Sequence, residues 1–197
     1  MYYIGCVKAI LWLPIIVIYY LFLDRNLIEI IKSDMSVFED PTVSFWAFAK
    51  DFAIHPEFRS IVYYRLRWRR IFWPILAKGQ TSLYLYTPEI GHSLFIQHGF
   101  STVLYAKKIG HHFFVNQQVT IGWNERGLPT IGDYVQVRAG AKIIGDVTIG
   151  DDVIIGANAV VVKDVPSHSV VVGVPGKIIK TRKNMEEVWS NVKGDME

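Results

Sequence analysis

The chain repeats a six-residue unit from Ile90 to Val165. The units read IGHSLF IQHGFS from Ile90, IGHHFF VNQQVT from Ile109, and IGDYVQ VRAGAK IIGDVT IGDDVI IGANAV from Ile131. An aliphatic residue opens each unit, at Ile90, Ile96, Ile109, Val115, Ile121, Ile131, Val137, Ile143, Ile149, Ile155 and Val161. A period of six fits neither the helical period nor strand alternation. It predicts a solenoid in which three short strands form each triangular coil and the aliphatic residues face a shared interior.

The repeat divides the chain into three predicted segments. Residues 1–80 form an apolar and helical N-terminal segment, 81–183 form the mainly-β repeat domain, and 184–197 form a short C-terminal helix and tail. Within the first segment, 27–77 reads as helical, with Ser33 or Asp34 as a helix cap. The C-terminal helix is predicted because Met185, Val188, Trp189 and Val192 follow helical spacing and form one apolar stripe.

Composition excludes some classes of protein. The net charge of the 197-residue chain is only +3, and the basic residues are dispersed, so we expect no nucleic-acid partner. The single cysteine, Cys6, excludes an intrachain disulfide and lies in an apolar run, which argues against a nucleophilic role.

Two stretches raise the prospect of contact with a membrane surface. The run from Ala9 to Leu23 carries no charge, but it is shorter than the roughly 20 residues of a membrane-spanning helix and contains Pro14. It could be a buried helix of an oligomer core, a segment in the membrane interface or a short span. Residues 63–73 place four arginines among aromatics, which fits either a solvated helix face or contact with anionic headgroups. Segments 1–25 and 63–73 are therefore the candidate membrane contacts.

Residues at the same position of units one coil apart should stack in a column. The third position of these units gives His98, Gln117, Ala139 and Ala157. The column thus begins with a titratable side chain, and its later side chains are as small as alanine. Such a groove could hold a long thin ligand such as a pantetheine arm beside an imidazole base.

An insertion interrupts the repeat between Ile121 and Ile131. The extra residues belong to the loop Trp123–Pro129, and loops on rigid scaffolds often carry binding residues. Trp123 could offer a stacking surface and Arg126 a charge for phosphate or carboxylate. The alternative is a surface bulge without function.

Residues 38–180 resemble the serine acetyltransferases, a family of hexapeptide-repeat acyltransferases with a left-handed parallel β-helix. The stretches that carry the resemblance are IGHSLFIQHG, the run from Ile131 to Lys180, and the segment Glu39-Asp40-Pro41-Thr42-Val43. The resemblance implies a homotrimer with active sites between neighbouring β-helices, and transfer of acetyl from acetyl-coenzyme A to a hydroxyl.

The same resemblance assigns roles to individual residues. His98 matches the general base and Asp40 an acceptor-binding residue. Backbone contacts to the pantetheine arm fall on Gly122, Ala139 and Ala157. The motif Val174-Pro175-Gly176-Lys177 matches the tail near the nucleotide end of the cofactor, which implicates Val174, Pro175 and Lys177.

Several departures from the family argue for a different acceptor. Gln97 stands where the family has an Asp before the base, and Gly127-Leu128 stand where it has an Arg-His pair that holds serine's carboxylate. The loop and the helical domain are also shorter. With Gln97, Trp123, Arg126 and Asp40 as acceptor contacts, we expect an O-acetyltransferase acting on a sugar of a surface polysaccharide, in the cytoplasm or at the inner face of the cell membrane. A serine O-acetyltransferase is the first alternative and a non-catalytic trimeric scaffold the second.

The chemistry needs a base that works near neutral pH, which an imidazole provides. His98 would accept the hydroxyl proton and return it to the leaving thiolate, without a covalent enzyme intermediate. Five other histidines compete: His55, His92, His111, His112 and His168. Some hexapeptide-repeat proteins resemble γ-class carbonic anhydrases, but the spacing of His98, His111 and His112 does not fit that three-histidine site. We expect no metal.

Overall fold

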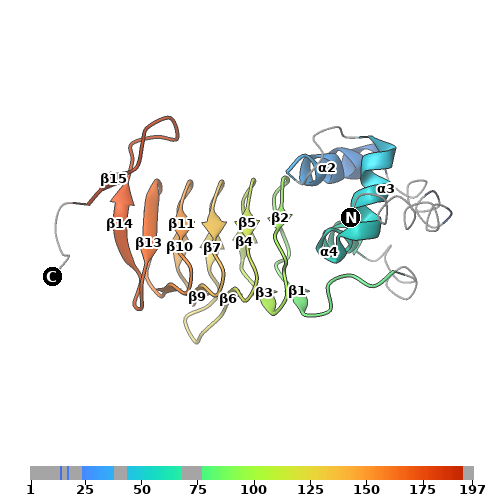
Figure 1. The fold of residues 1–197 in the computed structure, drawn as a ribbon. Helices are drawn as coiled ribbons and strands as arrows, with labels where there is room; N and C mark the ends of the chain where they lie inside the picture. Colours follow the sequence, from blue (N-terminus) through green and yellow to red (C-terminus); the bar gives the residue numbers. More distant parts are fainter. Residues whose placement is uncertain (1–13, 15–16, 18–23, 38–43, 68–76, 193–197) are drawn as a thin grey trace. The chain divides into compact units, whose positions relative to one another are not determined.

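The structure is a computed structural model that describes residues 14, 17, 24–37, 44–67 and 77–192. Its contacts divide the chain into two units. Unit 1 comprises Met1–Thr81 with His92–Phe95, and unit 2 comprises Ser82–Gly91 with Ile96–Glu197. Figure 1 labels their elements. Asp40, at 38–43, lies outside the described residues.

Unit 1 is helical. The described residues of this unit include the helices α2 (Arg25–Met35), α3 (Phe45–Ile54) and α4 (Pro56–Leu66). Asp24 caps α2 by accepting a hydrogen bond from the Leu27 N–H at 2.8 Å, and Ser44 caps α3 in the same way through Ala47. The prediction that Ser33 or Asp34 caps a helix was wrong, because both lie inside α2.

Asp34 instead belongs to the core of unit 1. Its side chain is fully buried and accepts two hydrogen bonds from Arg65, Nε to Oδ2 at 2.9 Å and Nη2 to Oδ1 at 3.0 Å. The Leu94 N–H donates a third at 2.8 Å. Burial raises the pKa of Asp34, and the Arg65 guanidinium opposes that rise. The surrounding apolar core includes the buried phenylalanines Phe48 and Phe52 of α3 and Phe58 of α4.

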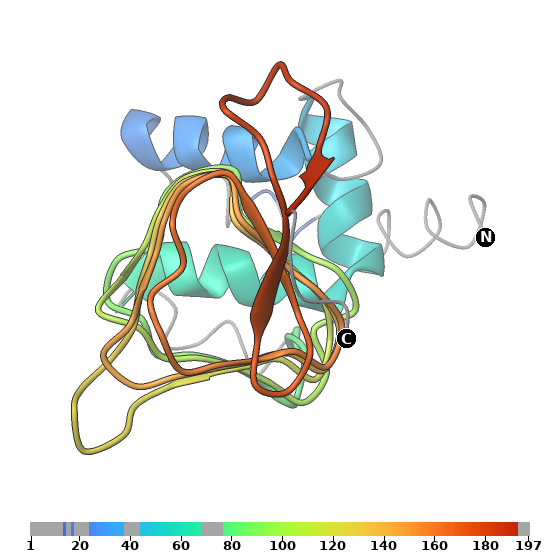
Figure 2. The same ribbon diagram turned by 90° about the vertical axis from the view of Figure 1, so that its left-hand side faces the viewer.

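Unit 2 is a parallel β-helix, as the repeat predicts. Sheet A orders β1 (Leu83–Leu85), β3 (Thr102–Leu104), β6 (Thr120–Gly122), β9 (Lys142–Ile144) and β12 (Val160–Val161). Sheet B contains β4 (Lys108–Ile109), β7 (Thr130–Ile131) and β10 (Thr148–Ile149). Sheet C orders β2 (Phe95–Ile96), β5 (Phe114–Val115), β8 (Gln136–Val137), β11 (Ile154–Ile155) and β13 (Ser169–Val172). Viewed along the axis, the coils superpose as a triangle (Figure 2).

The aliphatic residues that open the units line the interior. All eleven are at most 5% exposed, which confirms the predicted phase. Leu104, which the six-residue count passes over, is the inner residue of β3 and pairs with Ile121. A second set of buried residues precedes the strand residues by two positions, and includes Phe113, Val135, Val153 and Ala159. Each coil therefore buries about two residues per side of the triangle.

Glycines let neighbouring coils approach closely at the start of the turn from sheet B to sheet C. A Cβ at Gly110 would lie 2.6 Å from the backbone carbonyl of Gly132, and one at Gly132 would lie 2.8 Å from the backbone of Gly150. The Asp133 carboxylate accepts from the His111 N–H at 2.7 Å, and Asp151 accepts from the Asp133 N–H at 2.8 Å. The repeated Ile-Gly-Asp sequence thus encodes a close-packed turn.

The predicted C-terminal helix is wrong for the described residues up to Val192. Strand β14 (Lys177–Thr181) runs antiparallel to β13, and β15 (Ser190–Asn191) pairs with β14. Asn184 accepts hydrogen bonds from the N–H groups of Glu186 and Glu187, but it closes only a turn. The stripe residues do not form one packed face, since Val188 is 86% exposed whereas Trp189 stacks against Arg182.

No helix among the described residues is long and apolar enough to span a bilayer. Residues 1–13, 15–16 and 18–23, which hold most of the N-terminal apolar run, lie outside the described part.

Candidate active site

The predicted column of residues lies at the corner where sheet C passes to sheet A. Strand register pairs Val115 with Val137, Val137 with Ile155, and Ile155 with Val171. The Gln97 N–H donates to the Val115 carbonyl at 2.9 Å, which sets the first coil in the same register. The residues two positions after these strand residues therefore stack as His98, Gln117, Ala139, Ala157 and Gly173. At about 4.8 Å per coil, the column is roughly 19 Å long from His98 to Gly173.

His98 stands on a corner that is longer than the corners of later coils. Eight positions separate Ile96 from Leu104, whereas six separate Val115 from Ile121. His98 (φ 67°), Gly99 (φ 55°) and Ser101 (φ 52°) all adopt the left-handed backbone region. His98 is exposed and does not face the interior. Within the described part of the chain, no carboxylate hydrogen-bonds to its imidazole.

Backbone contacts hold this longer loop on both sides. The Phe100 carbonyl accepts from the Gln118 N–H at 2.9 Å in the next coil. On the other side, the Ser101 N–H donates to Ser82 Oγ at 3.0 Å, and the Thr102 N–H donates to the Ser82 carbonyl at 3.0 Å. The loop that carries His98 is thus fixed to the coil below it and to the strand above it.

Gln97 is held by a side chain of the next coil. The amide nitrogen Nδ2 of Asn116 donates to Oε1 of Gln97 at 2.8 Å. Asn116 follows Val115, just as Gln97 follows Ile96, so the two side chains are neighbours on the outer face of sheet C. The sequence reasoning singled out Gln97 but not Asn116; the column register is the signal that would have found it.

The inserted loop lies at a different corner of the triangle, between sheets A and B (Figure 2). Backbone hydrogen bonds between Asn124 and Gly127 close it, and Asn124 Oδ1 accepts from the Arg126 N–H at 2.9 Å. Trp123 is 66% exposed. Within one chain, Trp123 and Arg126 are therefore not brought beside His98, because each corner of a triangular coil points in its own direction.

The predicted cofactor residues occupy three places. Ala139 and Ala157 belong to the His98 column. Gly122 lies at the end of β6 on the outer face of sheet A, where an added Cβ would meet nothing nearer than Ile144 Cδ1 at 3.8 Å. Close packing between coils requires a glycine at Gly110 and Gly132, but it does not require one at Gly122.

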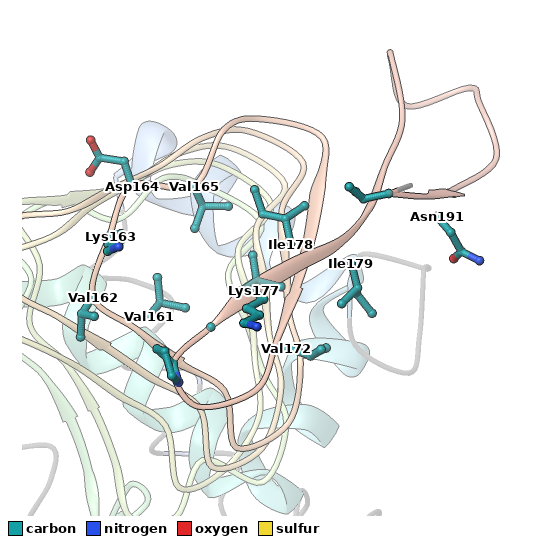
Figure 3. Close-up of a pocket in the computed structure, with 14 residues that line it drawn as sticks. Val161, Val162, Lys163, Asp164, Val165, Val172, Lys177, Ile178, Ile179 and Asn191 are labelled. Atoms are coloured by element: carbon teal, nitrogen blue, oxygen red, sulfur yellow. The ribbon is translucent and has the colours of Figure 1, made fainter. Parts of the chain in front are cut away.

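Pro175 and Lys177 line a cavity of about 850 Å³ at the last coil (Figure 3). Its apolar lining includes Val161, Val165, Val171 and Ile178. The Gly173 carbonyl accepts from the Val160 N–H at 3.0 Å, so the lower end of the column adjoins this cavity. Val174 is 72% exposed and does not line it.

The predicted headgroup contact at 63–73 is partly inside unit 1. Tyr63 is buried, and burial raises its pKa to about 12. Arg65 is committed to Asp34. These two residues therefore face the core of unit 1 and not a headgroup layer. Residues 68–73 lie outside the described part of the chain.

The other histidines have their own surroundings. His112 stacks on Tyr134 with ring centroids 4.5 Å apart, and His111 is exposed beside it. The Nδ1 of His92 lies 3.2 Å from the hydroxyls of Ser33 and Ser93. Among the described residues, no group of three or more His, Cys, Asp or Glu side chains could hold a metal ion.

His168 belongs to a charged cluster that ties the C-terminal hairpin to the β-helix. Its Nδ1 lies 2.8 Å from Asp152 Oδ2, and Arg182 Nε donates to the same oxygen at 2.7 Å. Arg182 also stacks on the Trp189 ring at 4.2 Å. Burial alone would raise the pKa of Asp152, but hydrogen bonds from Arg182 and His168 hold it below its usual value. Sequence reasoning missed this cluster, because its members are far apart in the chain.

The chain was compared first with protein families and curated sequences. A family model described as bacterial transferase hexapeptide (six repeats) matches residues 129–163. The serine acetyltransferase of Staphylococcus xylosus is 48% identical over 97 residues, which are 47% of this chain and 45% of that protein. The chain therefore spans about half the length of the curated relatives it matches.

Solved structures agree with the sequence match. The serine acetyltransferase of Neisseria gonorrhoeae in complex with serine is 27% identical, with a TM-score of 0.58 over 78% of this chain and 69% of that one. A serine acetyltransferase in complex with CoA is 25% identical, with a TM-score of 0.58 over 79% and 71%.

These findings correct the expected acceptor. The prediction of a sugar acceptor was wrong, since the similar proteins are serine acetyltransferases and the alternative, serine, is favoured. The error came from weighing a few substituted positions, such as Gln97 and Gly127, above the identity of the repeat as a whole. In sequence and in fold, this chain is a hexapeptide-repeat protein similar to the serine acetyltransferases.

Proposed function

We propose that this chain is an acetyl-coenzyme A-dependent O-acetyltransferase whose acceptor is the hydroxyl of serine. The observation that carries the proposal is the 48% identity over 97 residues to a serine acetyltransferase. Likeness to serine acetyltransferases solved with serine and with CoA supports both substrates. The candidate base His98, the column of small residues and the cavity at the last coil support the same proposal.

His98 acts as the general base. It accepts the proton of the serine hydroxyl, and the hydroxyl oxygen then forms a bond to the acetyl carbonyl carbon. The carbon–sulfur bond breaks, and the imidazolium returns the proton to the departing sulfur, so the enzyme ends as it began. The exposed position of His98, on a loop anchored at both sides, supports this role, because the ring is accessible and its backbone is fixed.

The column fits the pantetheine arm of the acyl donor. Below His98 the side chains of the column become smaller, from Gln117 to Ala139, Ala157 and Gly173. The smaller side chains leave room for an extended chain to lie against the coils. The column's length of roughly 19 Å, set by the strand spacing, separates a reactive thioester beside His98 from the cavity lined by Pro175 and Lys177. Lys177 offers a positive charge there to the phosphates of the donor.

A homotrimer follows from the same proposal, and the outer faces of the β-helix support it. Sheet A carries the exposed rings of Tyr84, Tyr86 and Tyr105. Sheet B presents polar and charged side chains such as Lys108 and Thr148. His98 lies at an edge of sheet A, so a partner that covers this apolar face would enclose the base.

Replacement of the base tests the mechanism. We expect His98→Ala to lower turnover with serine at least ~100-fold, the usual scale for loss of a general base. Acetyl-coenzyme A should still raise the melting temperature of the variant, since the column and cavity are unchanged. A variant with near-normal turnover would remove His98 from the mechanism.

A further inference from the structure

The C-terminal hairpin, residues 177–192, forms one wall of the cavity at the last coil. Strands β14 and β15 and the residue after β15 contribute Lys177, Ile178, Ile179, Asn191 and Val192 to its lining. The facing wall belongs to the β-helix and includes residues 161–165. Figure 3 draws the side chains of both walls. The shape of the cavity therefore depends on how the hairpin is held against the last coil.

Arg182, the residue after β14, holds the hairpin in this position. Its Nε donates to Asp152 Oδ2 at 2.7 Å, and its Nη2 donates to Asp152 Oδ1 at 2.5 Å. Its backbone N–H donates to the His168 carbonyl at 3.1 Å. The guanidinium also stacks on the ring of Trp189, which precedes β15. Because Asp152 and His168 belong to the β-helix, this one side chain joins both arms of the hairpin to it.

The cavity combines apolar walls with two positive charges. Its apolar surface includes the buried side chains of Val161, Val165 and Val171. Lys163 lines it from the last coil and Lys177 from β14. In the part of the chain that the structure describes, no carboxylate forms an ion pair with either lysine. Such a lining suits a ligand that joins an apolar ring system to anionic groups, as an adenine nucleotide does.

The cavity is continuous with the column that begins at His98. Val160 links the two, since its N–H donates to the Gly173 carbonyl at 3.0 Å and its carbonyl accepts from the Gly176 N–H at 2.7 Å. An acyl donor whose thioester lies beside His98 would reach the cavity with its nucleotide end. We propose that the hairpin closes a pocket for the adenine nucleotide of the acyl donor, and that Arg182 is the positioning residue for this wall. This inference rests on the proposed function.

Donors with and without the nucleotide test the proposal in the full-length protein. The kcat/KM is measured by thiol release with serine, for acetyl-coenzyme A and for acetyl-pantetheine, which lacks the nucleotide. With acetyl-coenzyme A, we expect Arg182→Ala to lower kcat/KM about 10-fold, the scale of a lost hydrogen-bonded contact. Lys163→Ala should lower it about 3-fold, the scale of an exposed ion pair. With acetyl-pantetheine, kcat/KM should stay unchanged in both variants.

The split between KM and kcat separates positioning from a general structural role. The kcat at saturating acetyl-coenzyme A should be unchanged, and the Kd of coenzyme A, measured by calorimetry, should rise with KM. Arg182→Lys should give a smaller loss, because lysine keeps the charge but cannot form the two-point contact with Asp152. Lys163→Ala leaves the hairpin intact, so it tests the ligand of the cavity even where Arg182→Ala unfolds the hairpin.

Lys183→Ala is the matched control, since it removes an exposed cation of the same hairpin that does not line the cavity. It should change neither the Kd of coenzyme A nor kcat/KM with either donor. Equal losses with the two donors, or a fall in kcat without a change in KM, would overturn the proposal.

The experiment also separates this inference from the proposed function. If the unaltered protein neither binds coenzyme A nor releases thiol with serine, the proposed function fails and the inference fails with it. If coenzyme A binds and serine is turned over, but the ratio of kcat/KM for the two donors is the same in all variants, only the inference fails.

Discussion

The two units of this chain differ in how well the sequence pattern predicts which residues are buried. In the β-helix, the same six-residue pattern recurs in every coil, and its eleven aliphatic positions are all buried. In the helical unit, the decisive polar residue, Asp34, looks like a helix cap but is a fully buried partner of Arg65. Repetition strengthens the prediction, because several coils show the same burial pattern independently. In a small helical unit each position occurs only once, so its burial cannot be inferred from a repeat.

The largest effect should come from breaking the buried pair of the helical unit. We expect Arg65→Ala to lower the free energy of unfolding of this unit by about 3–5 kcal/mol, because Asp34 would remain buried without its cation. The loss is measured by chemical denaturation followed through the helical circular dichroism signal. The exposed pair Lys32–Glu29 provides the control, where Lys32→Ala should cost less than about 1 kcal/mol. Equal losses from both variants would contradict the assignment of Asp34 to the core.

The next effect concerns glycines of the β-helix. At Gly132 an added Cβ would lie 2.8 Å from the backbone of Gly150, so Gly132→Ala should destabilise unit 2 by about 1–3 kcal/mol. At Gly122 the nearest atom is 3.8 Å away, so Gly122→Ala should leave stability within about 0.5 kcal/mol. The melting temperatures of the two variants, each compared with that of the unaltered protein, test this difference. Equal decreases would contradict it.

The Gly122 variant also tests the predicted cofactor contact. If the pantetheine arm meets the backbone at this position, Gly122→Ala should raise the KM for acetyl-coenzyme A several-fold while leaving the melting temperature of the free protein unchanged. An unchanged KM would remove Gly122 from the binding surface.

The smallest effect should be the acid dependence of the C-terminal hairpin. The pKa of Asp152 is lower in the folded chain than the ordinary value of 3.8 for an aspartate. Its ionised form therefore stabilises the fold above that value, and this contribution is lost as the pH falls through the lower, folded pKa. We expect Asp152→Asn to be less stable than the unaltered protein at neutral pH, with the difference shrinking below about pH 4. A difference that stays constant down to strongly acid pH would show that the carboxylate charge is not involved.

The sequence predicts the features of the β-helix that depend on the repeat, but not those that depend on contacts outside it. The period of six predicts the coil, the inner residues and the column from His98 to Ala157, because register in a β-helix is set by spacing alone. It cannot show that the corner at His98 is two residues longer, since Leu104 breaks the count. Nor can it pair Arg182 with Asp152, because Arg182 lies 30 residues further along the chain, beyond the repeat.

The C-terminal residues and the acceptor show two further limits. The stripe from Met185 to Val192 has helical spacing, yet β14 offers Ser190–Asn191 a strand partner, and local spacing carries no information about that partner. The acceptor was judged from single substitutions such as Gln97 and Gly127, although these are few positions beside the 97 residues that match a serine acetyltransferase.

The most direct test of the account is thiol release from acetyl-coenzyme A by the full-length protein, with L-serine offered beside a panel of sugars and with acceptor omitted. We predict robust release with serine, little with sugars, and loss of the serine-dependent signal in His98→Ala. Release that depends on a sugar and ignores serine, or no acceptor-dependent release at all, would contradict it.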